Sequence, residues 1–165
     1  MRFHCHNSVQ NMKYKIIQFT SKSWYLQFLL LYLFMSEKYI YKTRIYYEDT
    51  DAGGVVYYAN YFKFIERART EMIYKLLGLS HKSLKDNHDC IFLVSGLTAK
   101  FLKPIKFEDT IEVFTRILSK SAVRLKLEQI IKKNSDLMFK SEVDLAVVNS
   151  KGKLSKLDKG LLAKI

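Results

Sequence analysis

The amino-acid sequence predicts an α+β protein in which one sheet covers one long helix. Two patterns predict this class. Apolar residues recur at intervals of three and four between Tyr61 and Leu77, whereas alternating apolar and polar residues dominate from Ile91 onwards. A single amphipathic helix buries its apolar face most economically against one sheet.

Length and composition limit the kind of protein this is. The chain has 165 residues, of which 48% are hydrophobic and 27% charged, as expected for one globular domain. The two cysteines, Cys5 and Cys90, cannot form a disulfide framework. A reducing compartment therefore fits best, and we expect the protein in the cytoplasm.

The first 35 residues differ from the rest. Trp24–Met35 is an apolar run interrupted by Gln27. As a helix it rises only about 18 Å, less than the roughly 30 Å hydrocarbon core of a bilayer, and no small-residue cleavage site follows it. We expect residues 1–35 to be an extension outside a domain at 36–165, with translation starting at Met35. A peripheral membrane anchor is the alternative.

The first elements of the domain follow from local composition. Aromatic and β-branched residues predict a strand over Tyr39–Tyr47. The helix over Tyr61–Leu77 is expected to end at Gly78, a common C-cap residue. The polar segment Ser80–Asp86 predicts one further helical turn.

The second half predicts four strands. Ile91–Lys103 is one candidate and stops before Pro104. Alternation predicts the other three, and the hairpin turn KKNSD separates the last two. We expect these four strands to form a meander: Ile91–Lys103, Ile111–Ile117, Val123–Ile131 and Leu137–Val147.

Carboxylates crowd against a glycine pair where the first strand gives way to the helix. Asp51 stands before Gly53 and Gly54, which let the backbone approach a ligand closely. The amides from Val55 to Tyr58 are expected to be the unpaired donors of the helix N-terminus, and such donors suit a polarised carbonyl. Asp51 could then act as a nucleophile or orient water. Spacing alone favours the alternative, in which Asp51 only caps the turn.

Two long segments resemble a known family. Arg44–Tyr61 reads RIYYEDTDAGGVVYYANY and Leu93–Val113 reads LVSGLTAKFLKPIKFEDTIEV. Both are similar to the 4-hydroxybenzoyl-CoA thioesterase family, in particular its tol-pal-associated acyl-CoA thioesterase branch. The resemblance covers about Tyr39–Val148 and leaves residues 1–35 outside.

The resemblance implies a fold and an activity. The fold is the hotdog fold, a curved antiparallel sheet wrapped around one long central helix, in homodimers or homotetramers. The activity is hydrolysis of acyl-CoA to a carboxylate and free CoA, without a metal or an organic cofactor. The site lies between protomers, so the helix start of one chain would face Leu93–Leu97 of the other.

The resemblance also assigns roles to residues. Asp51 is the essential carboxylate, the amide of Tyr58 polarises the thioester carbonyl, and Tyr47 lines the site. Several members carry His at the position of Tyr58, so turnover or substrate range is expected to differ here. Independently of the resemblance, strand alternation indicates that Glu48 and Asp49 point away from the site, and we expect structural roles for them, paired with Arg44, Arg67 or Arg69.

The charge of the chain suggests anionic partners. The formal net charge is +12, which fits a solvated basic surface, a rim for a phosphorylated ligand, or contact with a membrane surface. Lys100, Lys103 and Lys106 are candidates for the phosphates of CoA.

Two other functions are alternatives to acyl-CoA hydrolysis. The first is a non-catalytic acyl-binding or scaffold protein acting with acyl carrier protein or cell-envelope partners; the intact Asp51, Gly53 and Gly54 argue against it. The second is a nucleic-acid binder, for which the sequence has no recognisable module.

Overall fold

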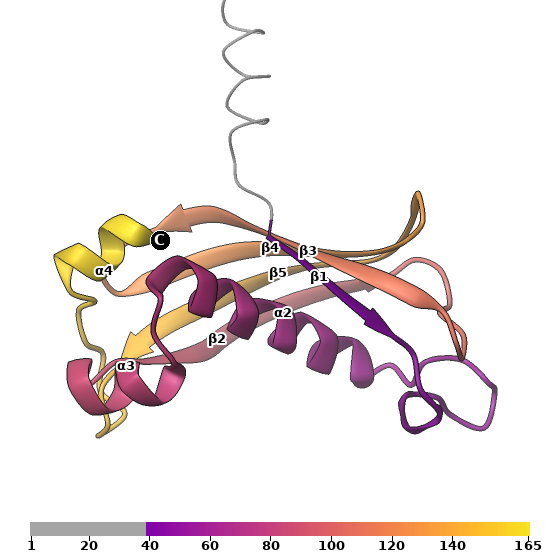
Figure 1. Cartoon of the computed structure of the whole chain (residues 1–165), viewed down its shortest axis with the longest axis horizontal. Coiled ribbons are helices and arrows are strands. Elements are labelled where there is room, and N and C mark those ends of the chain that lie inside the picture. The colour runs from indigo at the N-terminus through magenta and orange to yellow at the C-terminus, as the bar shows by residue number, and fades with distance from the viewer. Residues whose placement is uncertain (1–38) are drawn as a thin grey trace, which may run out of the picture. The chain divides into compact units, whose positions relative to one another are not determined.

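A computed structural model of the chain describes residues 39–165. The expectations for residues 1–35, including the start at Met35, lie outside this part, and the domain boundary at residue 36 stays a prediction. The elements of the described part, in chain order, are β1 (Tyr39–Arg44), η1 (Tyr47–Asp49), α2 (Asn60–Leu77), α3 (His81–His88), β2 (Ile91–Phe101), β3 (Thr110–Lys120), β4 (Arg124–Lys133), β5 (Asp136–Val148) and α4 (Lys159–Lys164) (Figure 1).

The two main helices form where the sequence predicts helical structure. Helix α2 begins one residue before the predicted start and ends at Leu77, with Gly78 as its C-cap; the φ of 66° at Gly78 is the left-handed conformation that glycine adopts without strain. Helix α3 is longer than the single turn predicted. Its N-cap residue Ser80 accepts a hydrogen bond from the Ser83 amide at 3.0 Å, which stabilises the first turn.

Strand β1 is shorter than predicted. It ends at Arg44 rather than Tyr47, because the next residues leave the sheet. The Ile45 amide donates to Asp109 O at 2.9 Å, and the Tyr46 amide donates to the Asp49 carboxylate at 2.9 Å. Side-chain competition for a backbone amide ends the strand here.

The prediction of a four-strand meander is wrong in one place. The sheet order is β1-β3-β4-β5-β2, with antiparallel neighbours, so β2 pairs with β5 and not with β3. Residues 102–109, which join β2 to β3, are too many for a hairpin loop and carry the chain from the β2 edge across the end of the sheet to β3, which lies beside the edge strand β1. β3, β4 and β5 do form a meander.

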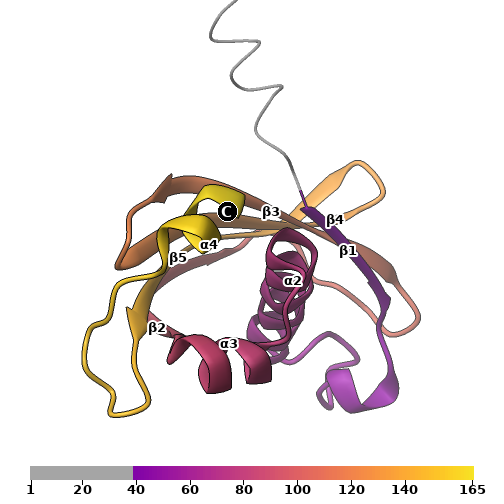
Figure 2. The ribbon, with the colours of Figure 1, turned by 60° about the vertical axis from the view of Figure 1, so that its left-hand side comes forward.

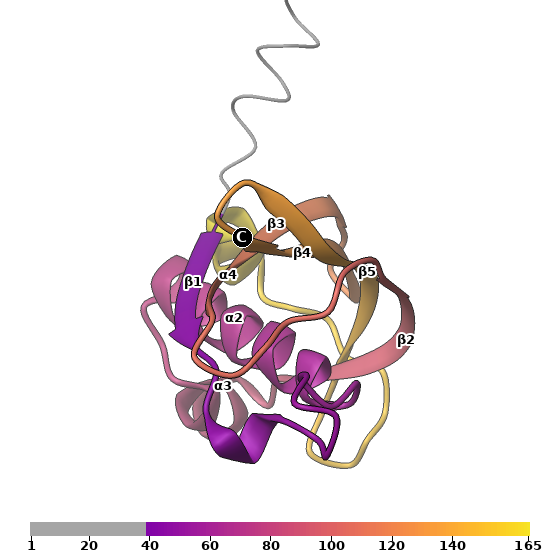
Figure 3. The same ribbon diagram turned by 90° about the vertical axis from the view of Figure 1, so that its right-hand side faces the viewer.

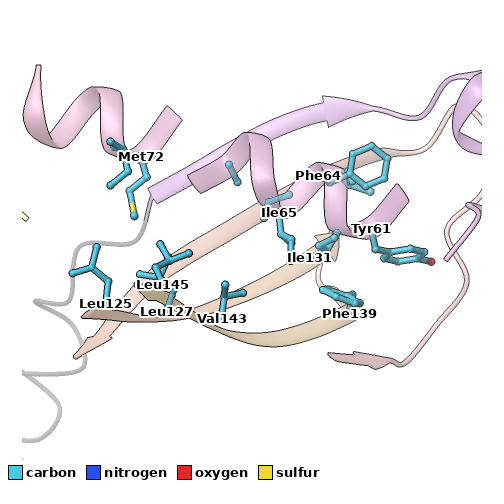
Figure 4. Packing of buried hydrophobic residues seen from close by; sticks show 14 of the residues in the cluster. Tyr61, Phe64, Ile65, Met72, Leu125, Leu127, Ile131, Phe139, Val143 and Leu145 are labelled. Atoms are coloured by element: carbon cyan, nitrogen blue, oxygen red, sulfur yellow. The ribbon is translucent and has the colours of Figure 1, made fainter. Parts of the chain in front are cut away.

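The sheet curves around α2, as Figure 2 shows from the end of the helix. One stripe of α2 is buried against the concave face of the sheet, where it meets side chains of β4 and β5 (Figure 4). Burying one large apolar side chain contributes about 1.5–3 kcal/mol, so the several buried side chains of this stripe stabilise the packing of α2 on the sheet. The labelled helix residues of this stripe are Tyr61, Phe64, Ile65 and Met72.

A buried polar network sets the height of α2 over the sheet. Gln129 of β4 is completely buried, and its amide nitrogen donates to Ile65 O and to Thr115 Oγ1, both at 2.9 Å. Its amide oxygen accepts from Arg69 Nη1 at 2.8 Å. Because each of these groups is costly to leave unpaired, the network favours one position of α2 on the sheet.

The loops gather at the two ends of the strands. Residues 45–59 and 102–109 lie together at the end that Figure 3 faces, where α2 begins. Helices α3 and α4 lie at the opposite end (Figure 1). Among the described residues, no helix has the length and apolar character required to cross a bilayer.

Candidate active site

The loop of residues 45–59 is held in place by Asp49. This carboxylate is buried and accepts from the Tyr46 amide. The Asp49 carbonyl accepts from the Tyr57 amide at 2.9 Å and from Asn60 Nδ2 at 3.0 Å, and Asn60 is the first residue of α2. Asp49 therefore ties the loop to the helix, and its partners are backbone and amide groups rather than the arginine that the sequence suggested.

Asp51 lies in a tight turn that the glycines make possible. The Gly54 amide donates to Asp51 O at 3.0 Å, and the Gly53 amide donates to Asp51 Oδ1 at 2.8 Å. Gly54 has a φ of 73°, and a Cβ on Gly53 would lie 3.1 Å from Asp51 Oδ1. Gly54 is therefore favoured by its positive φ angle, and Gly53 by the lack of space for a side chain.

The Asp51 side chain is exposed, and only one of its two oxygens is used by the turn. Oδ1 binds the Gly53 amide, whereas Oδ2 has no hydrogen bond within residues 39–165. Asp51 therefore forms the turn, as the alternative based on its spacing predicted. This role leaves the second carboxylate oxygen open to solvent and to a ligand.

The amides before α2 differ from the expectation. The helix begins at Asn60, and two of the expected free donors are already paired: the Val56 amide donates to Ile105 O at 2.8 Å and the Tyr57 amide to Asp49 O. Before the helix starts, the loop forms two isolated β-bridges, Thr50 with Val56 and Val55 with Lys106. The hydrogen bonds of these bridges use the two amides. In the described part of the chain, the amides of Val55 and Tyr58 have no backbone acceptor.

Aromatic side chains surround this loop. Tyr47 is 78% exposed and stacks on Phe107, with ring centroids 3.9 Å apart. Tyr57 and Tyr58 lie side by side with centroids 4.6 Å apart, and the hydrogen bond and charge of the Tyr58 phenol raise the pKa of Tyr57. These rings form exposed apolar surface next to the Asp51 turn.

Residues 105–107 complete the same end of the molecule. Val55 bridges Lys106 through the backbone, and Phe107 carries the Tyr47 ring. Phe107 is not among the site residues predicted from the sequence. Its signal would have been an aromatic residue just beyond the only proline, but its contact with Tyr47 spans 60 positions of the chain and is not a local property.

The three lysines proposed for CoA phosphates lie in different surroundings. Lys106 is exposed beside the Asp51 turn. Lys103 Nζ is 2.7 Å from Asp136 Oδ1 in an exposed ion pair. Lys100 pairs with Lys140 on β5, one position away from Phe101 and Ala99, so it points to the opposite face of the sheet from those two residues. The structure brings only Lys106 next to the Asp51 turn.

Strand β2 borders the site and forms one edge of the sheet. Its helix-facing residues include Val94, Leu97 and Phe101, all of which are exposed. Phe101 also contacts Tyr61 of α2 edge-on, with ring centroids 5.2 Å apart. This edge is open and apolar within the described chain.

Sequence comparisons give relatives of stated activity. The chain is 38% identical over 107 residues to "Acyl-CoA thioester hydrolase YbgC" of Escherichia coli O6:H1, covering 64% of this chain and 78% of that protein. It is 36% identical over 106 residues to "Acyl-CoA thioesterase YbgC" of Haemophilus influenzae, covering 64% and 77%.

Structural comparison agrees. A probable thioesterase from Bartonella henselae superimposes with a TM-score of 0.70 at 28% identity, covering 74% of this chain and all of that chain. The hotdog fold is thereby confirmed. Residues 53–139, more than half of the chain, match the thioesterase superfamily. The chain therefore belongs to the thioesterase superfamily.

Proposed function

We propose that this protein hydrolyses the thioester bond of an acyl-CoA and releases a carboxylate and free CoA. Its class as a thioester hydrolase follows from the superfamily and from relatives at 36–38% identity. One observation supports Asp51 as the reacting carboxylate: it is exposed, held by Gly53 through one oxygen only, and lies in the loop that precedes α2.

The bond changes are simple in either of two routes. As a general base, Asp51 takes a proton from water while the water oxygen bonds to the thioester carbon. As a nucleophile, Asp51 bonds to that carbon itself and forms a mixed anhydride that water then cleaves. In both routes the C–S bond breaks and the CoA sulfur leaves as a thiolate that takes up a proton.

Charge develops on the carbonyl oxygen before the C–S bond breaks. The Tyr58 amide, which has no backbone acceptor among residues 39–165, is our candidate donor to this oxygen. One well-placed donor is worth about 3 kcal/mol in a transition state. Tyr47, Gly53, Gly54 and Val55 would line the same opening, and Lys106 is the foremost of the three candidates for a CoA phosphate.

A second copy of the chain would complete the site. The exposed apolar residues of β2 lie on the free edge of the sheet, where an antiparallel partner strand can pair. We propose a homodimer, or a tetramer built from two such dimers, in which Leu93–Leu97 of the partner faces the Asp51 turn. Analytical ultracentrifugation of the purified chain tests this, and a monomer with full activity would contradict it.

The branch within the superfamily is also a proposal. The segment Arg44–Tyr61 and the relatives named YbgC support the tol-pal-associated branch. We propose acyl carrier protein as an alternative carrier of the acyl group, because a thioester on its phosphopantetheine arm has the same reacting atoms.

Thiol release from a panel of acyl-CoA substrates tests the function. Short, long and aromatic acyl groups are compared, with release followed by a thiol reagent. Hydrolysis of at least one class well above the uncatalysed rate is expected, and no release from any would contradict the proposal. Single turnover in ¹⁸O-water then tests the nucleophilic route: label in Asp51 identifies it as the nucleophile, because water that attacks the aspartyl carbon of the mixed anhydride leaves its oxygen on the side chain. Label in the product alone is expected from the general base, and also from a mixed anhydride that water attacks at the acyl carbon, so chemical trapping of the acyl-enzyme distinguishes these two.

A further inference from the structure

The cations of this chain are unevenly distributed over the described residues. The end of the molecule opposite the Asp51 turn consists of α3, α4, residues 149–158 and the turn between β3 and β4, and we refer to it as the basic end. Its exposed cationic side chains are Lys82, Lys85, Lys120, Arg124, Lys151, Lys153, Lys156, Lys159 and Lys164. Its acidic side chains are Asp86, Asp89 and Asp158.

Contacts between these segments bring the charges together. The Leu157 amide donates to Ala122 O at 2.7 Å, and Lys120 Nζ donates to Leu162 O at 3.3 Å. On the other side, the Ser150 amide donates to Asp89 Oδ1 at 2.8 Å. The four segments are therefore neighbours, as Figure 1 shows at the end of the sheet that carries α3 and α4.

The cations of the basic end are not neutralised by ion pairs. Within residues 39–165, every ion pair lies on other parts of the domain, for example Arg116–Glu128 and Lys126–Glu142 on the sheet. Two of the three acids at the basic end already serve the backbone: Asp89 accepts from Ser150, and Asp158 accepts from Gly160 and Leu161. The surplus positive charge is thus open to an external anion.

This charge is too far from the Asp51 turn to attract substrate within one chain. The 11 residues of β2 run between the two ends, which at about 3.3 Å per residue separates them by roughly 35 Å. The Debye length at physiological ionic strength is about 8 Å, so the two ends are screened from each other.

An exposed leucine lies among the lysines. Leu154 is 62% exposed and stands between Lys153 and Lys156, after a turn that Asn149 holds by accepting from the amides of Lys151 and Lys153 at 3.1 and 2.9 Å. A flexible lysine carries a point charge that suits a diffuse anionic surface, whereas arginine suits bidentate recognition of a single group. Arg124 is the only arginine among the exposed cations named for the basic end.

We propose that the basic end is a docking surface for an anionic lipid membrane, with the lysines of residues 151–156 at the headgroups and Leu154 inserted between them. Lysines near an anionic leaflet contribute independently of a defined pocket, and one buried leucine adds apolar contact. The proposal does not depend on the thioesterase chemistry, because it uses none of the residues of the Asp51 turn.

Sedimentation with vesicles tests the proposal on the full chain. Vesicles of phosphatidylcholine with phosphatidylglycerol are compared with phosphatidylcholine alone, at low and high salt. We expect binding to the anionic vesicles only, lost at high salt. The variant K151Q/K153Q/K156Q should bind more weakly by about fivefold per lysine, or roughly a hundredfold in all. L154S should lose a few-fold.

A matched control separates position from total charge. K42Q/K63Q/K132Q removes the same charge elsewhere in the domain and is expected to bind as the parent chain does. If K151Q/K153Q/K156Q is unstable by thermal unfolding, K82Q/K85Q/K159Q replaces it. Its expected loss is smaller, because these lysines lie at the basic end but outside residues 151–156, and it still exceeds that of the control.

Four results would overturn the proposal. One is equal binding of the lysine variant and the control. Another is equal binding to neutral vesicles, which would assign membrane contact to apolar groups. The third is vesicle binding unaffected by K151Q/K153Q/K156Q while the KM for acyl-CoA rises, which would assign these lysines to substrate across a subunit contact. Binding to a short DNA duplex without vesicle binding would likewise favour another partner.

Discussion

The two ends of this domain differ in how they use charge. Around the Asp51 turn, Asp49 is buried and bonded to backbone groups, Lys103 is paired with Asp136, and the exposed surface is largely aromatic. At the basic end, the exposed lysines have no ion-pair partner among residues 39–165.

This difference changes the meaning of the net charge. A value of +12 for the chain suggests a phosphorylated ligand. In the described domain, however, most of the unpaired positive charge lies away from the turn where the thioester is proposed to react. Total charge therefore says little about the reaction, and the following variants test each end separately.

The largest effect is expected at Asp51. Asp51→Asn keeps an oxygen that can accept from the Gly53 amide but removes the carboxylate, so folding should be nearly unchanged and hydrolysis should fall by several orders of magnitude. Thermal unfolding and thiol release measure the two properties. Turnover near that of the parent chain on every substrate would refute the role of Asp51.

Asp49 should behave in the opposite way. Asp49→Ala removes the acceptor for the Tyr46 amide, which is expected to cost about 1–3 kcal/mol of unfolding free energy. Urea denaturation measures this loss. Asp49→Asn keeps a carbonyl acceptor and should recover part of it. Equal stability of the alanine variant and the parent would show that Asp49 does not anchor the loop.

Lys106 offers a direct comparison between the ends. Lys106→Gln is expected to raise the KM for acyl-CoA about two- to fivefold with little change in kcat, because an exposed ion pair contributes up to about 1 kcal/mol. Lys151→Gln, with the same chemical change at the basic end, should leave KM unchanged. Equal changes in both variants would contradict the assignment of Lys106.

The smallest effect concerns His81, the first residue of α3 at the basic end. Its ring lies 5.4 Å from that of Tyr74 and 6.5 Å from that of Phe92, and its Nε2 has no hydrogen-bond partner. Burial lowers the pKa of His81, although the Glu66 carboxylate opposes this. The unfolded chain therefore binds the proton more readily, and stability should decrease as the pH falls below about 6.5.

Unfolding temperatures between pH about 7.5 and about 5.5 measure the His81 contribution. In His81→Phe this part of the pH dependence should disappear, since no group titrates at that position. The carboxylates with lowered pKa values, such as Glu128 and Asp136, lose their contribution only at more acidic pH. An unchanged pH profile in His81→Phe would show that another group is responsible.

Local patterns were sufficient for most elements. Helix α2 was predicted to within one residue, because its period of apolar residues and its terminal Gly78 depend only on nearby positions. The α+β class and the last three strands followed in the same way. The turn around Asp51 was also predicted, because the adjacent residues Gly53 and Gly54 indicate a tight backbone turn from the sequence alone.

Strand partners and side-chain surroundings needed the folded chain. Nothing in Ile91–Lys103 indicates that β2 pairs with β5 instead of β3, because the choice depends on the path of residues 102–109 across the end of the sheet. Likewise, the sequence around Lys100, Lys103 and Lys106 does not distinguish these three lysines. In the structure, Lys100 lies on the face of β2 opposite to Phe101, and Lys103 pairs with Asp136.

The sequence by itself therefore determined the element types, the thioesterase resemblance and the position of the carboxylate–glycine turn, because each depends on neighbouring residues. The tertiary structure decided which amides before α2 are paired, that Asp49 is buried while Asp51 is exposed, and that the unpaired lysines gather at one end. Those properties arise from contacts between residues distant in the chain, and no local pattern encodes them.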